Sequence, residues 1–173
     1  MVARLHHNAV EAHKEVNMQA PEKIDPGSLA DYLDVMSKSV FQAGISWLEV
    51  EAKWPEIRQA VRGFEPAVVA DLTEKDLDDL TNDRRVIRNR RKLDAIVENA
   101  RRMVDLAEHH GSFHIYLRSH GGFENMVKDL RKQFRFLGNT GAYHFLWVVN
   151  EEVPFYEEWC ASRGRTPQTA VPK

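Results

Sequence analysis

One segment of this sequence combines a hairpin-like connection with groups that suit an anion. Residues 130–149 read LRKQFRFLGNTGAYHFLWVV, and helical patterns flank the short connection at 134–139. Backbone N–H groups that open the second helix, from Asn139 to Gly141, form an anion site whose usual occupant is phosphate. Three bases add positive charge around it: Arg131, Lys132 and Arg135. The alternative is an ordinary helix–helix turn whose two phenylalanines belong to the core.

A run of bases follows an acidic stretch earlier in the chain. Residues 82–102 hold eight bases against three acids, whereas residues 65–79 hold six acids against one lysine. The net charge is only −2, but such an uneven distribution lets one face hold a polyanion. Residues three or four apart share a helix face, so Arg88 lies with Arg91 or Lys92 and only part of the run can face a ligand. The alternative is two solvated helix faces.

The elements that must position these residues are all predicted to be helices. Apolar residues recur at helical spacing, N-cap residues Ser28, Thr73 and Ser112 each precede a pattern, and Pro55 breaks another. Helical patterns cover residues 28–38, 56–61, 66–72, 87–108, 112–117, 123–133 and 140–149, with a further helix after Thr73. No stretch has the alternation of a strand. We therefore predict an all-α, multi-helix globular domain with a helix-hairpin-helix motif.

Composition indicates one folded domain. The chain has 173 residues, 43% hydrophobic and 29% charged, which is typical of a globular protein. We expect a single domain over 1–173, with 1–23 as an N-terminal arm or helix and 162–173 as a flexible tail. One cysteine, Cys160, excludes an intramolecular disulfide. The chain lacks both a signal core and an apolar run of the roughly 20 residues that a membrane helix needs, so we expect a cytoplasmic protein without membrane contacts.

Three motifs occur in order between residues 40 and 150. They are FQAGISW at 41–47, VIRNRRKL at 86–93 and FRFLGNT at 134–140, with Tyr143 following. They resemble the Q-A-G-L-S-W, I-I-R-N-R-x-K-I and G-F-K-F-V-G-x-T motifs of the bacterial type I 3-methyladenine DNA glycosylases, in the helix-hairpin-helix superfamily. The resemblance implies a repair enzyme that flips alkylated purines out of damaged double-stranded DNA and hydrolyses the N-glycosidic bond. We expect a monomer without a cofactor.

The resemblance also implies roles for the turn in the first motif. Trp47 would line the base pocket, where an electron-poor methylated purine stacks on indole, and Ile45 would be the wedge that fills the gap in the duplex. Gly44 would let the turn approach DNA, and Gln42, an expected base contact, would offer hydrogen bonds to the intruded strand or the opposite base. The other expected base contacts are Phe41 and Tyr143, and the other expected DNA contacts are Arg88, Arg91, Lys92, Arg135, Gly138, Asn139 and Thr140. The alternatives are a core aromatic for Trp47 and a surface amide for Gln42.

Ser39 is a departure from the family pattern, which has a base-recognising glutamate three residues before the glutamine. A hydroxyl removes a charged acceptor whose hydrogen bond is worth roughly 1.5 to 3 kcal/mol. A cationic 3-methylpurine is already a good leaving group, so activity can survive; we keep Ser39 and Trp47 as catalytic positions. The superfamily often has a catalytic aspartate after the second hairpin helix; Glu151 or Glu152 lies near that spacing, and we take Glu151 as the third catalytic candidate, with a surface acid as the alternative.

The family's zinc site is also missing. Glu152 stands where a His ligand would be and Tyr156 where a Cys ligand would be, so the two-Cys, two-His set cannot form. We expect no bound metal. Two hypotheses follow: a monofunctional glycosylase, without lyase activity because no lysine is placed for a Schiff base, or a divergent protein that binds DNA or damaged bases without efficient cleavage. A helical protein-interaction module would leave the basic run at 88–92 unexplained. The glycosylase hypotheses require Trp47 and the turn at 138–140 to open onto a common cleft.

Overall fold

The computed structural model describes residues 21–166, and in that range every element is a helix. The α-helices are α2 (Leu29–Gln42), α3 (Trp47–Ala60), α4 (Pro66–Ala70), α5 (Glu74–Asn82), α6 (Arg90–His110), α7 (Phe113–Leu117), α8 (Phe123–Gln133), α9 (Asn139–Val148) and α10 (Tyr156–Ser162), with 3-10 turns at Arg62–Phe64 and Arg118–His120. The predicted all-α class is confirmed. Most of the expected N-terminal arm and of the expected tail lies outside the described residues. Among the described helices, none is long and apolar enough to cross a membrane.

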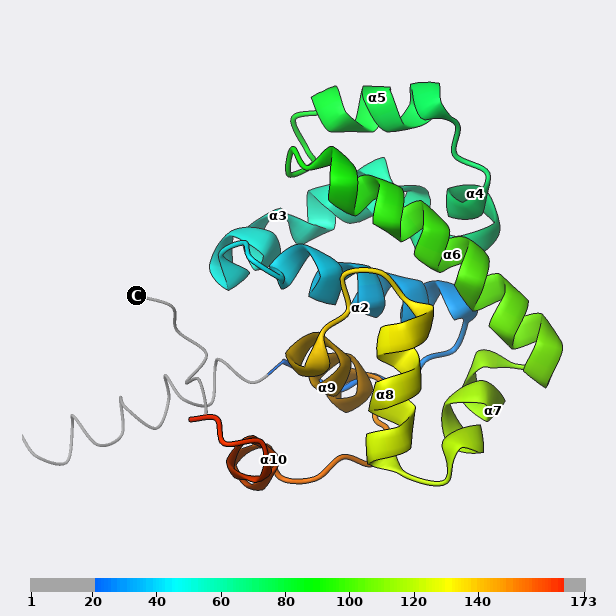
Figure 1. Ribbon diagram of the computed structural model, residues 1–173. Coiled ribbons are helices and arrows are strands. Elements are labelled where there is room, and N and C mark those ends of the chain that lie inside the picture. The colour runs from blue at the N-terminus through cyan, green and yellow to red at the C-terminus, as the bar shows by residue number, and fades with distance from the viewer. Residues whose placement is uncertain (1–20, 167–173) are drawn as a thin grey trace, which may run out of the picture.

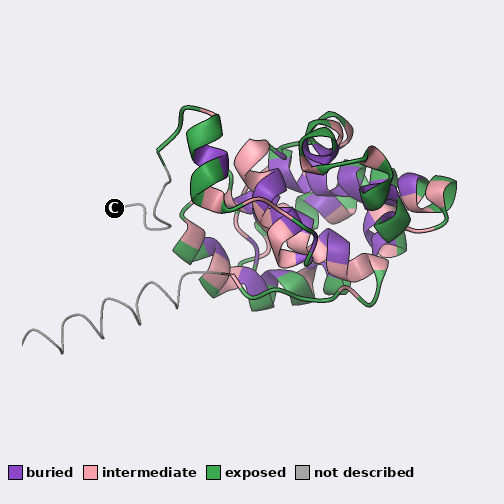
Figure 2. Ribbon diagram, turned by 90° about the horizontal axis from the view of Figure 1, so that it is seen from below, coloured by how far each residue is buried: buried purple, intermediate pink, exposed green. Residues whose placement is uncertain are grey.

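Helix α2 runs through the middle of the molecule and packs against α3, α6 and α9 (Figure 1). It begins with a capping box in which the Ser28 hydroxyl accepts the Asp31 N–H and the Asp31 carboxylate accepts the Ser28 N–H. One side of the helix is then buried in the core (Figure 2). The buried hydrophobic residues are Tyr32, Leu33, Met36, Val40 and Phe41. This burial holds α2 in the core, and the helix ends at Gln42.

Helix α3 continues through Pro55, which we had interpreted as a break in the pattern. A proline inside a helix removes one backbone hydrogen bond, but buried residues on both sides of it hold α3 together as one element. These are Val50, Trp54 and Ile57. The Trp54 indole N–H also donates to Asp34 of α2 at 2.7 Å. Tertiary packing therefore overrides the local cost of the proline.

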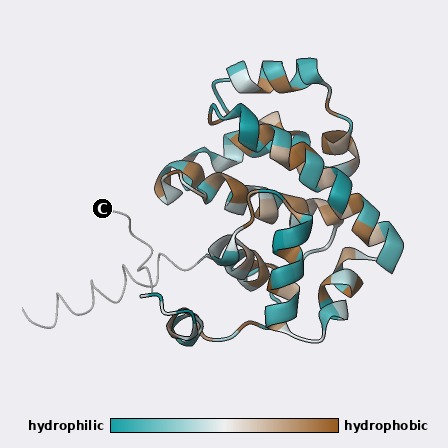
Figure 3. Ribbon diagram, viewed as in Figure 1, coloured by the Kyte–Doolittle hydropathy of each residue, from teal (hydrophilic) through white to brown (hydrophobic). Residues whose placement is uncertain are grey.

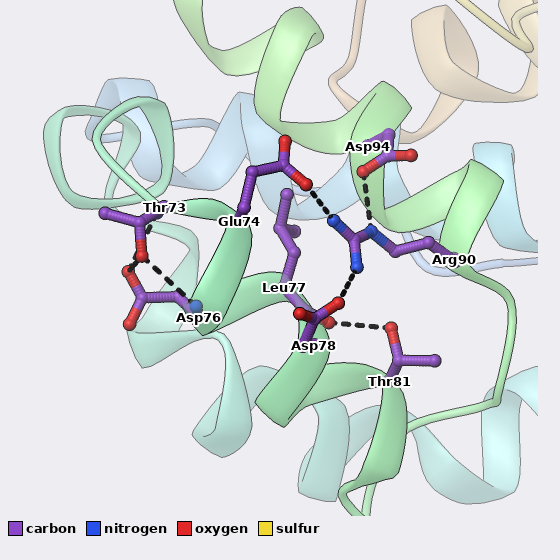
Figure 4. Close-up of polar contacts among 8 residues, drawn as sticks. All are labelled: Thr73, Glu74, Asp76, Leu77, Asp78, Thr81, Arg90 and Asp94. Carbon is purple, nitrogen blue, oxygen red and sulfur yellow. Dashed lines mark hydrogen bonds and ion pairs between the residues drawn. The ribbon is translucent and has the colours of Figure 1, made fainter.

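Arg90, the first residue of α6, joins that helix to α5 (Figure 4). Its guanidinium contacts Glu74 at 2.5 Å, Asp94 at 2.8 Å and also Asp78. Helix α5 starts with a capping box at Thr73, as predicted. Hydrophobic and hydrophilic bands alternate along α6 (Figure 3), as expected of an amphipathic helix with one side on the core. These ion pairs therefore hold the start of α6 against α5.

Asp129 on α8 anchors the hairpin's first helix to the preceding segment. Its carboxylate accepts hydrogen bonds from the Tyr116 hydroxyl at 2.7 Å and the Gln133 amide at 3.3 Å, and His120 Nε2 lies 2.9 Å away. His120 Nδ1 lies 3.0 Å from the Leu117 carbonyl, so both ring nitrogens face oxygen acceptors. Burial opposes ionisation of Asp129, but these hydrogen bonds outweigh it and hold the pKa of Asp129 below its ordinary value.

Helix α10, which the sequence patterns did not predict, packs on α9 through aromatic rings. The Tyr143 ring stacks on Trp159 with centroids 4.7 Å apart, and its hydroxyl donates to the Pro154 carbonyl at 2.8 Å. Tyr143 is only 3% exposed. The structure therefore places Tyr143 in the core beneath α10, and the base contact expected of it is not available in this arrangement.

Candidate functional site

Residues 43–46 form a tight turn that presents Trp47. Gly44 has φ +81°, a conformation that favours glycine, and a Cβ at this position would meet no atom within 4 Å. Ser46 caps α3 by accepting the Glu49 N–H at 3.4 Å. Trp47, the first residue of α3, is half-buried. Its indole is therefore held by the protein without being sealed inside it.

The side chains around this turn differ in exposure. Gln42 is half-buried, and Ile45 is partly buried against the core. Leu48, which follows Trp47 in the sequence, is 62% exposed and leaves an apolar side chain in solvent. Phe41 is fully buried and meets Trp54 edge-on, with centroids 6.0 Å apart. Phe41 is thus a core residue, and its expected contact with a base is replaced by packing within the protein.

Lys92 lies inside the protein, where a DNA contact had been expected. The residue is 5% exposed, and its ammonium donates to the Val40 carbonyl at 2.7 Å, to the Phe41 carbonyl at 3.0 Å and to the Ala43 carbonyl. Burial lowers the pKa of this amine. An ammonium has three donors, and all three have protein acceptors here. Lys92 therefore has no N–H left for a phosphate.

The connection between α8 and α9 is clamped from α6 by Asn99. The side chain is 2% exposed, its Oδ1 accepts the Arg135 N–H at 2.8 Å, and its Nδ2 donates to the Arg135 carbonyl at 3.1 Å. Phe134 and Leu137 are buried, whereas Phe136 is 38% exposed and has φ +55°. Our sequence analysis did not assign this role to Asn99. The one available signal was a polar residue within the apolar stripe of α6.

Helix α9 begins at this connection without a side-chain cap from residues 21–166 on its first backbone N–H groups. Gly138 is the exposed N-cap residue, and no side chain among the described residues caps the helix that Asn139 and Thr140 begin. A Cβ on Gly141 would lie 3.9 Å from the Ser39 Cβ, so the first turn of α9 lies against α2. Ser39, which is 7% exposed, therefore lies on the last turn of α2, on the side that meets the start of α9.

The first turn of α6 contacts both parts of the candidate site. The Arg91 guanidinium lies 5.8 Å from the Phe136 ring centroid, in a cation–π arrangement, while Lys92 holds the end of α2. Arg88 is exposed and donates to Asn82 at 3.2 Å. The helix expected over 87–108 begins only at Arg90, with Asn89 as its N-cap, so Arg88 precedes it and does not share a helix face with Arg91 or Lys92. Arg88 and Arg91 are exposed, whereas Lys92 faces inward.

Arg135, in the connection between α8 and α9, is exposed but forms an ion pair with an acidic side chain. Its guanidinium lies 2.7 Å from Glu98, and exposed pairs of this kind contribute about 0 to 1 kcal/mol. A phosphate can therefore compete for Arg135 at small cost. The hairpin and the first turn of α6 bring Arg91, Arg135 and the start of α9 to one region of the surface.

Glu151 lies elsewhere. Its carboxylate is 6% exposed and accepts from Arg118 Nε at 3.2 Å, with His114 Nδ1 at 3.5 Å. Glu151 follows the C-terminal end of α9, where its N–H donates to the Leu146 carbonyl at 2.9 Å. The first turn of α9 lies against Ser39 near the end of α2, and the 10 residues of α9 span about 15 Å, so Glu151 is not brought together with Trp47.

A cavity of about 310 Å³ opens between α5, α6 and the hairpin. Its charged lining consists of Glu74, Arg91, Asp94, Glu98, Arg101 and Arg135. Three bases balance three acids, and Trp47 is not part of the lining, so this cavity is not assigned as the base site. Within residues 21–166, no group of His, Cys, Asp and Glu side chains could hold a metal ion.

Comparisons with known proteins bear on this arrangement. Residues 30–133 match the family model described as methyladenine glycosylase. The DNA-3-methyladenine glycosylase of Haemophilus influenzae is 31% identical over 126 residues, which cover 61% of this chain and 68% of that protein. DNA-3-methyladenine glycosylase 1 of Escherichia coli is 29% identical over 65% of this chain and 73% of that protein.

Solved structures share the fold. The 3-methyladenine DNA glycosylase I of Staphylococcus aureus superposes with a TM-score of 0.67 at 24% identity, covering 76% of this chain and 81% of that one. A mutant of the Staphylococcus aureus enzyme gives a TM-score of 0.61 at 27% identity, over 76% of this chain and 80% of that one.

Proposed function

This chain belongs to the methyladenine glycosylase family, and on that premise we propose that it is a DNA glycosylase acting in base-excision repair. Its substrate is damaged double-stranded DNA, from which it removes alkylated purines of the 3-methyladenine type. The proposal is supported by a half-buried Trp47 at the start of α3 and by the uncapped start of α9. The first turn of α6 contacts Ala43, in the turn that precedes Trp47, and Phe136, in the connection that precedes α9, and the first turn of α9 lies against Ser39 of α2. Helices α2 and α6 therefore hold both the turn that carries the aromatic surface for a base and the helix start that offers N–H donors to a phosphate.

Binding follows from the position of each group. Backbone N–H groups of Asn139 to Gly141 bind a phosphate at the N-terminus of α9, and Arg91 adds a charge beside the hairpin. The glycine turn at Gly44 approaches the duplex, and apolar surface from Ile45 enters the space left by the flipped nucleotide. Extruding a base costs a few kcal/mol, least for a damaged one, and stacking on Trp47 offsets this cost.

Hydrolysis of the N-glycosidic bond of a methylated purine needs little assistance from the protein. The methylated purine carries a positive charge, which the Trp47 ring stabilises during binding. The bond between the sugar C1′ and the base nitrogen breaks, its electron pair goes to the base, and the base leaves neutral. Water adds its oxygen to C1′ and loses a proton, which gives an abasic site. Ser39 lies at the back of this region as a hydroxyl that can hydrogen-bond to the base.

Lyase activity is not part of the proposal. A Schiff base requires a free amine near C1′, and the buried Lys92 donates all its hydrogen bonds to carbonyls of α2 and the following turn. The second candidate function is binding of damaged DNA without efficient excision. It is favoured by Ser39 in the place of a glutamate and by the distance of Glu151 from Trp47.

Release of free base from methylated DNA tests the proposal. Duplex DNA alkylated by a methylating agent is incubated with the protein, and the released purines are separated and quantified, with unmethylated duplex as control. We expect release of 3-methyladenine and an abasic strand that remains intact until treated with base. Binding to the methylated duplex without release above the buffer control would instead support the second candidate.

A further inference from the structure

The end of α2 has carbonyl groups that its own helix does not satisfy. The last four C=O groups of a helix lack intrahelical partners, and α2 has no basic residue in its last turn. The Ala43 N–H reaches the Ser39 carbonyl at 3.3 Å. The carbonyls of Val40 and Phe41 then need donors from another part of the chain.

Lys92 supplies these donors from α6, about 50 residues further along the chain. Its ammonium is bonded to the carbonyls of Val40, Phe41 and Ala43. A cation is stabilised at a helix C-terminus because the carbonyl dipoles point toward it. The Lys92 backbone is held as well, since its N–H donates to the side chain of Asn89, the N-cap residue of α6, at 3.2 Å.

The third acceptor of Lys92, the Ala43 carbonyl, connects this contact to the candidate site as well as to the stability of α2. Ala43 is the first residue after α2, and only Gly44, Ile45 and Ser46 separate it from Trp47. Gly44 has φ +81° and no neighbour at its Cβ position, and Ala43 and Ser46 are exposed, so within the turn Ile45 alone packs against the core. Its departure point from α2 is therefore set by the bond between Lys92 and the Ala43 carbonyl.

We propose that Lys92 is a positioning residue, which fixes the 43–46 turn and thereby the placement of Trp47 for the flipped base. The inference rests on the proposed function. It differs from the phosphate contact expected from the sequence, because a buried ammonium without a free donor cannot neutralise a phosphate. Its neighbour Arg91, which is exposed, is the residue of this turn that meets DNA.

The test is Lys92→Met, which keeps the length of the side chain and removes its donors, compared with Lys53→Met. Lys53 is a matched control because it also donates to a backbone carbonyl, that of Arg84 at 3.1 Å, outside the site. For Lys92→Met we expect a single-turnover excision rate about 100-fold lower, the order of loss that a 1 Å misplacement causes. The affinity for undamaged duplex and its salt dependence should equal those of the wild type.

Hydrogen exchange separates positioning from general stability. In Lys92→Met we expect faster amide exchange confined to residues 42–47, with Lys53→Met unchanged there. An unchanged excision rate, or protection lost evenly over the whole protein, would overturn the proposal. So would a salt slope lowered by about one, which identifies a lost phosphate contact.

A measurement on the unmodified protein covers the case in which Lys92→Met does not fold. In protein labelled with ¹⁵N and ¹³C, the Lys92 ammonium should show through-bond couplings to the carbonyl carbons of Val40, Phe41 and Ala43; missing couplings would overturn the inference. If wild-type protein releases no base, the proposed function fails alone, because the exchange pattern still decides whether Lys92 fixes the turn.

Discussion

The clamp between Asn99 and the hairpin gives a prediction whose size can be worked out from the contacts. Asn99→Ala removes two hydrogen bonds to the backbone of Arg135, at 2.8 and 3.1 Å. Each is worth about 0.5 to 1.5 kcal/mol net, so the free energy of unfolding should fall by roughly 1 to 3 kcal/mol. For a domain of this size that corresponds to a Tm lower by roughly 2 to 12 °C.

The same substitution should weaken DNA binding, because the connection that leads into α9 loses its fixed place. A hydrogen bond to a charged group is worth roughly 1.5 to 3 kcal/mol, so losing one phosphate contact should weaken affinity for undamaged duplex by about tenfold or more. Urea unfolding measures the first effect, and fluorescence anisotropy with a labelled duplex measures the second.

Asn125→Ala is the matched control for this pair of measurements. Asn125 is exposed and makes one hydrogen bond, from its Nδ2 to the His120 carbonyl at 3.3 Å, so its removal should change stability by less than about 0.5 kcal/mol. If Asn99→Ala matches this control in both urea midpoint and DNA affinity, the hairpin does not depend on the clamp and the reasoning is refuted.

Three further outcomes are expected. Arg91→Gln should lower DNA affinity and reduce the salt slope by about one, whereas Arg90→Gln should lower the urea midpoint and leave the slope unchanged; equal slopes for both would contradict the assignment. The pKa of Asp129 lies below its ordinary value of 3.8, so its carboxylate stabilises the fold above that pH and the contribution is lost as the pH falls; Asp129→Asn should flatten the stability profile between about pH 5 and pH 2. Tyr143→Phe should cost about 1 kcal/mol of stability by removing the bond to Pro154, and a large loss of base release in that variant would show that Tyr143 meets the base.

Local signals in the sequence predicted many element boundaries. Ser28, Thr73 and Ser112 cap helices as expected, and Gly111 ends α6 with φ +91°, because capping depends on neighbouring residues alone. The prediction that Pro55 breaks the helix was wrong, because packing between residues far apart in the sequence decides whether a helix tolerates a proline. The short α10 was missed for the same reason, because it is held by aromatic rings of α9 and α8.

The candidate site was predictable in its location and less so in its individual contacts. Gly44 and Trp47 lie at the turn that joins α2 to α3, and the DNA and base contacts that the resemblance implies for them stay predictions. Residue type alone could not separate Arg91 from Lys92, since adjacent residues lie about 100° apart around a helix and only the fold shows which of the two directions faces solvent. Phe41 and Tyr143 were expected at the base for their aromatic rings, but the same rings serve the core equally well.

The central claim is that the Trp47 indole receives the extruded methylated purine. The most direct measurement is single-turnover release of 3-methyladenine by Trp47→Ala, with Trp147→Ala as the control. Trp147 is also half-buried, but lies at the far end of α9, where its indole N–H donates to the Pro21 carbonyl at 3.3 Å. We predict that Trp47→Ala binds undamaged duplex as the wild type does and releases no base above buffer, while Trp147→Ala retains release. Wild-type release by Trp47→Ala would contradict the claim.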